Sequence, residues 1–239
     1  TAIQLLLKYL EAEKVEYIFG IPGGPLMPLY EAMFDSGRVR HILAKHEGGA
    51  AFMADGYARV RGGLGVCCAT TGPGATNALT GVACAYMDSV PILLLTAQVA
   101  LSAFGKGAAQ ESSFHGVDVV ELYKPVTKAS LMLLSGDKMS ETARFALRTA
   151  FSGRPGPVHL SLPADLMKKV VPRDLVPPSQ YRASFEHFDR GAVKEACRLL
   201  AAAKRPAILC GHGVYLSRAW PELKRLAERL GAPVATSPK

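Results

Sequence analysis

Apolar residues along this chain recur at helical spacing in some stretches and form short continuous runs in others, and the two patterns alternate. The first helical pattern extends to about Lys14 and contains Ile3, Leu6, Leu7 and Leu10. Continuous runs rich in β-forming and apolar residues predict six strands, at 15–19, 40–44, 65–69, 92–96, 126–129 and 158–162. Between them the spacing predicts helices at 26–35, 50–61, 75–87 and 137–151.

Strands that alternate with helices predict an α/β fold, here a parallel six-stranded sheet flanked by helices. In such sheets ligands bind beyond the carboxyl ends of the strands. Four features follow predicted strands directly: the pair Gly23-Gly24, the carboxylate of Glu47, the turn 72–74 and Gln98. Their convergence predicts a ligand site at this edge of the sheet.

The C-terminal part of the chain has a different pattern. Four prolines within 163–182 and few periodic apolar residues predict a linker, which we place at 166–188. Helices at 190–203 and 219–230 and strands at 207–209 and 234–236 then predict the start of a second α/β domain, at 189–239. Because two strands cannot bury a stable sheet alone, and because no initiator methionine is present, we expect a piece of a longer protein.

Composition narrows the class of protein. Hydrophobic residues make up 49% and charged residues 20% of the chain, as in soluble globular proteins. No apolar run reaches the ~18 residues of a membrane span and no leader pattern is present, so we expect no membrane partner. The net charge of +8 is spread along the chain without a nucleic-acid-binding motif, so we expect no nucleic-acid partner either. Five cysteines without a CxxC pair predict reduced thiols and a cytoplasmic location.

Several stretches carry recognisable motifs: GIPGG, KHEGGAAFMADGYAR, GVCCATTGPGATN, AYMDSVPILLLTAQV, AAQES and GRPGPVHLSLP. With these motifs the chain resembles the thiamine diphosphate (ThDP)-dependent enzymes, and within them it is most similar to the acetohydroxyacid (acetolactate) synthase branch. The resemblance implies a pyrimidine-binding domain at 1–165, followed by the start of the family's central domain. It also implies decarboxylation of a 2-oxo acid substrate and ligation of the product to an acceptor.

The resemblance assigns roles to particular residues. Glu47 matches the glutamate that hydrogen-bonds the cofactor's aminopyrimidine ring, and we expect it to be catalytic together with Gln110, which matches a glutamine near the substrate. The cofactor-binding residues implied are Gly23, Gly24, Glu47, Pro73 and Asn77. From the residues alone, Glu47 fits equally well as a carboxylate that favours a helix N-terminus. We interpret His46 as structural and leave the role of His115 open.

The resemblance also implies components outside this sequence. In the family, Mg²⁺ and the cofactor's diphosphate are held by a GDG…N motif on another domain, which nothing here matches, so we expect no metal ligands in this chain. Binding of FAD stays undecided. A homodimer or homotetramer with the active site between subunits is the implied assembly.

Two positions depart from the synthase pattern. Ala109 replaces a phenylalanine and Ala164 replaces a lysine, which widens the substrate approach and removes a positive charge. Other ThDP-dependent 2-oxo-acid decarboxylases, oxidases or lyases therefore stay open as alternatives. From a different class, a non-catalytic module that retains the fold is also an alternative.

Overall fold

The computed structural model describes residues 1–183 and 188–238, which fall into two units, Thr1–Ala183 and Ser184–Lys239. The first unit contains a six-stranded sheet in the order β2-β1-β3-β4-β6-β5, and every neighbouring pair is parallel. This confirms the predicted α/β fold. The strands are β1 (Tyr17–Gly20), β2 (Arg40–Leu43), β3 (Gly65–Ala69), β4 (Ile92–Gln98), β5 (Ala129–Met132) and β6 (Val158–Pro163).

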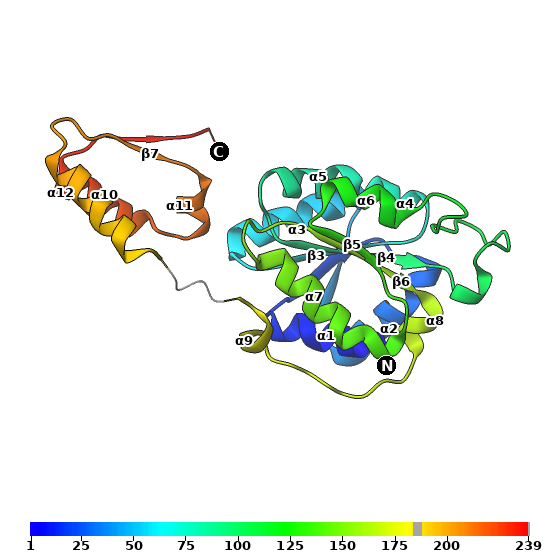
Figure 1. Cartoon of the computed structure of the whole chain (residues 1–239). Coiled ribbons are helices and arrows are strands. Elements are labelled where there is room, and N and C mark those ends of the chain that lie inside the picture. The colour runs from blue at the N-terminus through cyan, green and yellow to red at the C-terminus, as the bar shows by residue number, and fades with distance from the viewer. Residues whose placement is uncertain (184–187, 239) are drawn as a thin grey trace. The chain divides into compact units, whose positions relative to one another are not determined.

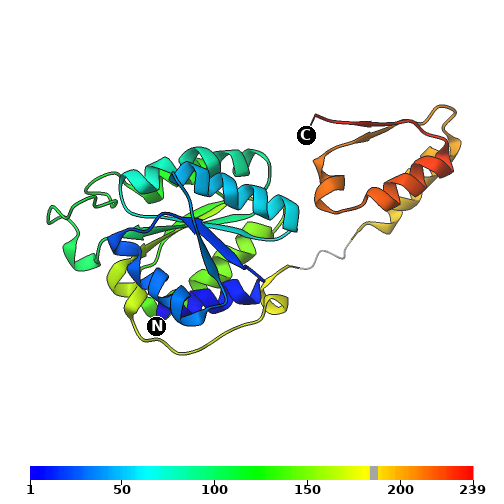
Figure 2. The same ribbon diagram turned by 180° about the vertical axis from the view of Figure 1, so that it is seen from behind.

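Helices cover both faces of this sheet, as Figures 1 and 2 show from opposite sides. One face is covered by α1 (Ala2–Ala12), α2 (Met27–Ser36), α7 (Met139–Phe151) and α8 (Ala164–Lys168). The other is covered by α3 (Glu47–Arg61), α4 (Pro73–Asn77), α5 (Leu79–Met87) and α6 (Val119–Tyr123). Short 3-10 turns complete the unit: η1 (Gly24–Leu26), η2 (Leu101–Ala103), η3 (Lys124–Val126) and η4 (Gly136–Lys138).

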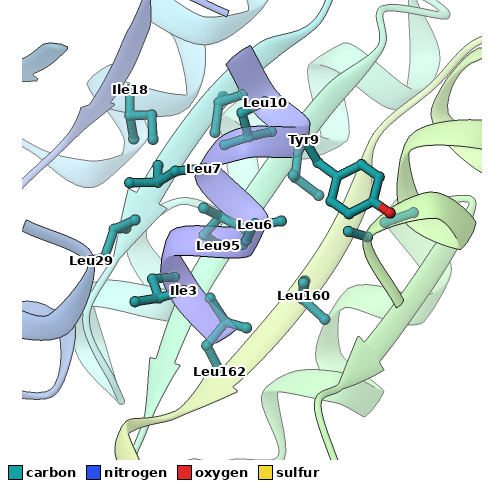
Figure 3. Close-up of a cluster of buried hydrophobic side chains, with 14 of the residues drawn as sticks. Ile3, Leu6, Leu7, Tyr9, Leu10, Ile18, Leu29, Leu95, Leu160 and Leu162 are labelled. Atoms are coloured by element: carbon teal, nitrogen blue, oxygen red, sulfur yellow. The ribbon is translucent and has the colours of Figure 1, made fainter. Parts of the chain in front are cut away.

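Strand residues alternate between two separate cores because successive side chains point to opposite faces. On the first face, which we call the leucine face, Leu95 and Leu160 pack under α1. Figure 3 shows the α1 side chains of the same buried cluster, Ile3, Leu6, Leu7 and Leu10. On the second face, which we call the alanine face, the helices contribute mostly alanines: Ala50, Ala51, Ala54, Ala58, Ala75, Ala78 and Ala85.

Local contacts explain where the structure differs from the predicted elements. The strand expected at 126–129 lies three residues later, as β5, because η3 continues α6 and the Thr127 hydroxyl donates to the Tyr123 carbonyl. The helix expected at 75–87 is divided into α4 and α5. At this break the Ala75 carbonyl accepts a hydrogen bond from the Tyr123 hydroxyl, at 2.5 Å. The short helix α6 itself was not predicted.

The stretch expected as a linker is packed against the first unit for most of its length. The hydroxyl of Tyr9 donates to the Asp174 carbonyl at 3.0 Å. Tyr181, in α9 (Pro178–Tyr181), is buried and donates to the Glu13 carboxylate at 2.6 Å. The two units divide after Ala183, within the expected linker at 166–188, and residues 184–187 of that linker lie outside the described residues.

The second unit contains two parallel strands, β7 (Ile208–Cys210) and β8 (Val234–Thr236). Its helices are α10 (Arg190–Ala202), α11 (His212–Leu216) and α12 (Trp220–Leu230), of which α11 was not predicted. Among residues 188–238, Cys210 is the one buried residue. Within the described parts of the chain, no helix is both long and apolar enough to span a membrane.

Candidate active site

The loops that follow β1, β2 and β3 meet around Thr70, the residue after β3. A Cβ built on Gly23 would lie 2.4 Å from the Thr70 hydroxyl oxygen, so only glycine fits there. A Cβ on Gly74 would lie 2.8 Å from the Thr70 methyl carbon and 3.3 Å from Oε1 of Glu47. The structure therefore brings these predicted strand-end features into contact distance of one another.

Glu47 is the first residue of α3, and its position is set by a cap. His46 has extended backbone, and its Nδ1 accepts a hydrogen bond from the Gly48 amide at 3.0 Å. This bond satisfies one of the amides that a helix start leaves unpaired. The contact supports the structural interpretation of His46.

Among the described residues the Glu47 carboxylate has one hydrogen-bond partner. The side-chain amide of Asn77 donates to its Oε2 at 3.0 Å, across 30 positions of sequence. No hydrogen bond reaches Oε1 in the part of the chain that the structure describes. Glu47 is half-buried, whereas Asn77 and Pro73 are exposed. One carboxylate oxygen is thus fixed, and the other is left for a further contact.

Close packing of α3 against α5 makes the Glu47–Asn77 contact possible. A Cβ on Gly81 would lie 2.5 Å from the Ala51 Cβ and 3.1 Å from the Gly48 carbonyl oxygen. Glycine and alanine at these positions let the two helix backbones approach. Because α4 leads directly into α5, this approach also brings Asn77 to the N-terminus of α3.

Gln110 lies on the loop after β4, beside the turn that opens α4. Its left-handed backbone has φ of 59°, and its Oε1 accepts from the Thr71 hydroxyl at 3.4 Å. Gly72 is also left-handed, with φ of 58°, and a Cβ there would lie 3.0 Å from the Gln110 Cβ. The structure therefore places Gln110 against the same turn that carries Pro73.

The other positions singled out in the sequence lie in different elements and loops. Gly24 begins η1 and a Cβ there would meet nothing within 4 Å. His115 is exposed, and the centroid of its ring lies 4.0 Å from that of Phe114; no hydrogen bond joins it to Glu47 in the described part of the chain. Ala109 is exposed beside Gln110, and Ala164 begins α8.

Three further residues, not predicted from the sequence, hold these groups together: Thr70, Thr71 and Ser112. Thr70 and Thr71 lie within a recognised motif, but their contacts to Gly23 and Gln110 join distant segments. Ser112 lies within the AAQES motif, but nothing in that motif indicates its hydrogen bonds to the Gly72 amide and the Gln110 carbonyl. Each of the three acts through packing or hydrogen bonds that a local pattern does not encode.

The cysteines and the possible metal ligands of the chain also bear on the chemistry of the site. Burial raises the pKa of the Cys68 thiol to about 11, so this cysteine is a neutral packing residue behind the site. All five cysteines, each in the described part of the chain, are free. No group of three or more His, Cys, Asp or Glu side chains positioned to hold a metal ion occurs among residues 1–183 and 188–238.

Comparison with known proteins gives two family matches. Residues 1–121 match the thiamine pyrophosphate enzyme N-terminal TPP binding domain. Residues 193–239 match the thiamine pyrophosphate enzyme central domain. These matched segments lie within the ranges predicted as a cofactor-binding domain, 1–165, and as the start of a second domain, 189–239.

Individual relatives are similar over almost the whole chain. A probable acetolactate synthase large subunit of Methanocaldococcus jannaschii is 43% identical over 241 residues, which cover 98% of this chain and 39% of the relative. The acetolactate synthase of Mycobacterium bovis is 40% identical over 240 residues, covering 99% and 38%. The acetolactate synthase isozyme 1 large subunit of Escherichia coli is 36% identical over 233 residues, covering 98% and 40%. The chain spans about two fifths of the length of these relatives.

Proposed function

Because the chain belongs to the thiamine pyrophosphate (thiamine diphosphate) enzyme family, we propose that it is part of an acetolactate-synthase-like enzyme. The proposed enzyme decarboxylates a 2-oxo acid and joins the remaining carbon unit to an acceptor. The observation that carries this proposal is the Glu47–Asn77 hydrogen bond at the point where three strand-end loops meet. The names of the similar relatives support the same activity.

The residues present fit the aromatic end of such a cofactor. Glu47 has one oxygen held by Asn77, and its Oε1 is free to share a proton with a ring nitrogen. Pro73 is exposed one turn away and offers an apolar surface to a ring. Gly23 lets its loop lie directly against Thr70, where a side chain would not fit, and Gly24 leaves open space beside the loop that a ligand can approach. When bound, thiamine diphosphate supplies an electron sink for the decarboxylation.

In this proposal each residue of the chain has a limited task. Glu47 holds and returns a proton at its Oε1, and Asn77 keeps the carboxylate in one orientation. Gln110 donates its side-chain amide to a polar atom of the substrate. A core of this fold has no need of a half-buried carboxylate paired with an amide, which disfavours a non-catalytic module.

In this proposal, the binding sites for the diphosphate and Mg²⁺ are not formed by the residues of this chain. Glu47 already accepts from the Asn77 amide, and no group of three or more His, Cys, Asp or Glu side chains that could hold a metal ion occurs among the described residues. We therefore assign the metal and the diphosphate to another domain of the complete enzyme. FAD is not part of the proposal, and the visible absorbance of the purified full-length protein decides its presence.

The proposal is tested with the full-length protein, ThDP, Mg²⁺ and pyruvate, with products followed by proton NMR. Acetolactate is the expected product, and Glu47→Gln should lower turnover by about 100-fold or more, as expected for loss of a proton-transfer group. Glu141→Gln is the matched control, because Glu141 lies on α7 and, among the described residues, pairs with the exposed Lys138 alone. Acetaldehyde or acetate would instead assign the protein to a decarboxylase or oxidase.

Two results would contradict the proposal. Absence of saturable ThDP binding to the wild-type protein would exclude the enzyme. Retention of more than about a tenth of the wild-type turnover in Glu47→Gln would remove Glu47 from the proton transfer.

We also propose that the active assembly is a homodimer or homotetramer in which a second subunit covers this site. The support is a set of exposed apolar side chains on α3, the helix that begins at Glu47. Phe52 is 46% exposed, Met53 is 43% exposed and Val60 is 89% exposed. Large exposed apolar patches on a protein surface often mark interaction sites.

Substitution of these side chains tests the assembly. Phe52→Glu combined with Met53→Glu should shift the full-length protein towards monomer in sedimentation velocity, because charges would be buried unpaired. Phe34→Glu on α2 is the matched control, since Phe34 is even more exposed but lies on the other face of the sheet. An unchanged distribution in the double variant would place the interface elsewhere. A reducing, cytoplasmic location remains part of the proposal and is supported by the free thiols.

A further inference from the structure

Gln98 joins two segments of the chain from a fully buried position at the end of β4. Its side-chain Oε1 accepts hydrogen bonds from the Val99 amide at 2.9 Å and from the Ser112 amide at 3.1 Å. Its Nε2 has no hydrogen-bond partner within the described residues. The side-chain oxygen of Gln98 therefore holds the backbone of Ser112 against the end of β4.

Ser112 extends this connection to the turn at Gly72 that opens α4. Its hydroxyl oxygen accepts from the Gly72 amide at 2.6 Å and donates its own proton to the Gln110 carbonyl at 3.1 Å. The directions are fixed, because an amide N–H only donates and a carbonyl only accepts. Ser112 is 1% exposed, so water does not compete for either bond. One hydroxyl thus ties the turn that opens α4 to the backbone of Gln110.

The backbone of Gln110 needs such support. Non-glycine residues rarely have positive φ, and they keep that conformation where the surrounding structure holds them in it. The Gln110 side chain adds a contact to the Thr71 hydroxyl, at 3.4 Å. This longer contact is weaker than the two bonds of Ser112, so the serine is the main support.

We propose that Gln98 and Ser112 are positioning residues, which hold the Gln110 side chain at a fixed place beside the turn that carries Pro73. The proposal rests on the proposed function, in which Gln110 contacts the 2-oxo acid. Gln98 sets the depth of the loop relative to the sheet, and Ser112 sets its distance from the turn. Neither side chain touches the substrate itself, since both are fully buried.

Kinetics of the full-length protein give the first test. Ser112→Ala removes the hydroxyl, and Gln98→Met keeps the length of the side chain but removes the acceptor. Each should lower kcat/KM for the 2-oxo acid by about 10- to 100-fold, as expected when a reacting group is displaced by around 1 Å. Ser161→Ala should leave kcat/KM unchanged, because the buried Ser161 hydroxyl has no partner among the described residues.

A double-mutant cycle separates positioning from general destabilisation. In a Gln110→Ala background, Ser112→Ala should cost less than about threefold in kcat/KM, because its effect passes through Gln110. If the loss is the same with and without Gln110, the serine acts independently and the proposal is overturned. Gln98→Met repeats the cycle from the other end of the connection if Ser112→Ala does not fold.

Amide hydrogen exchange gives a readout without turnover. Exchange of segments 71–73 and 110–113 should be faster by about tenfold or more in Ser112→Ala and Gln98→Met, and unchanged in Ser161→Ala. Unchanged exchange in both test variants overturns the positioning role whatever the activity. If wild-type protein neither binds ThDP nor turns over substrate, the proposed function fails, and faster exchange then shows that the connection holds the loop without serving this reaction.

Discussion

The two faces of the six-stranded sheet are closed in different ways, although the same strands supply both. On the leucine face, large side chains from α1 interlock with Leu95, Leu160 and Leu162 of the strands. On the alanine face, helices α3 and α5 approach closely over alanine and glycine. Buried polar strand residues accumulate on this second face, where His159 contacts Thr96, Ser130 and Tyr123.

The difference shows how stability and site are divided within one domain. Large leucines remove much apolar surface from water and stabilise the sheet. Small residues on the other face stabilise less per residue, but they let helix backbones approach and leave room for hydrogen-bonded polar groups. Glu47, Pro73 and Asn77 all lie on helices of the alanine face. The site is therefore built where packing depends on close backbone approach.

The largest effect on stability is expected from Leu160→Ala on the leucine face. Leu160 is fully buried, so the truncation leaves a cavity, and we expect a loss of about 2–5 kcal/mol in the free energy of unfolding. Its neighbour Ser161 is equally buried, but its hydroxyl has no hydrogen-bond partner among the described residues, so Ser161→Ala should change the free energy of unfolding by less than about 1 kcal/mol. Urea unfolding followed by far-UV circular dichroism compares the two. Equal losses would mean that the two faces do not differ as described.

A smaller effect is expected from Gly81→Ala on the alanine face. The added methyl would overlap the Ala51 Cβ and push α5 away from α3, at a cost of about 1–3 kcal/mol in unfolding free energy. Gly63→Ala is the control, because nothing lies within 4 Å of a Cβ there and φ is not left-handed. Urea unfolding of both variants measures the difference. Activity should fall with Gly81→Ala as well, since Asn77 moves with α5; full activity would mean that the helix spacing does not set the Glu47 contact.

The smallest effect, counted as the change in unfolding free energy per pH unit, is expected from protonation of His159. Burial lowers the pKa of His159 to about 3, whereas the unfolded chain protonates near 6.5. Ser130 donates its hydroxyl to the Val120 carbonyl, so its oxygen accepts from Nδ1 of a neutral His159, and Thr96 donates to Nε2. Below about pH 6.5 the unfolded chain binds a proton at His159 that the folded protein does not bind. The free energy of unfolding is therefore unaffected by His159 above about pH 6.5, and it decreases as pH falls towards 3, by at most about 1.4 kcal/mol per pH unit.

Stability measured from pH 7 to pH 4 tests this assignment. His159→Gln cannot protonate, so its stability should fall less steeply over that range than wild type, even where its absolute stability is lower. If the unfolding free energy of the two proteins falls equally steeply with pH, other groups, chiefly the carboxylates, control the loss of stability in acid.

The sequence by itself determined most of the local structure and the edge at which the site lies. Apolar spacing gave all six strands of the first unit, with one displaced by three residues, because strand and helix periods are properties of neighbouring residues. The residues expected to bind the cofactor lie in the loop after β1 or in the helical turns that follow β1, β2 and β3: Gly23, Gly24, Glu47, Pro73 and Asn77. Their roles in catalysis remain predictions.

Only the tertiary structure decided which of these residues touch. Asn77 reaches Glu47 across 30 positions and Ser112 reaches Gly72 across 40 positions, and neither contact has a local pattern. It also showed that most of the Pro-rich stretch packs on the first unit, since Tyr9 and Glu13 supply its partners. Such contacts depend on how distant segments are brought together by the sheet order. Periodicity along the chain specifies which face of an element is buried, but not which distant side chain it will meet.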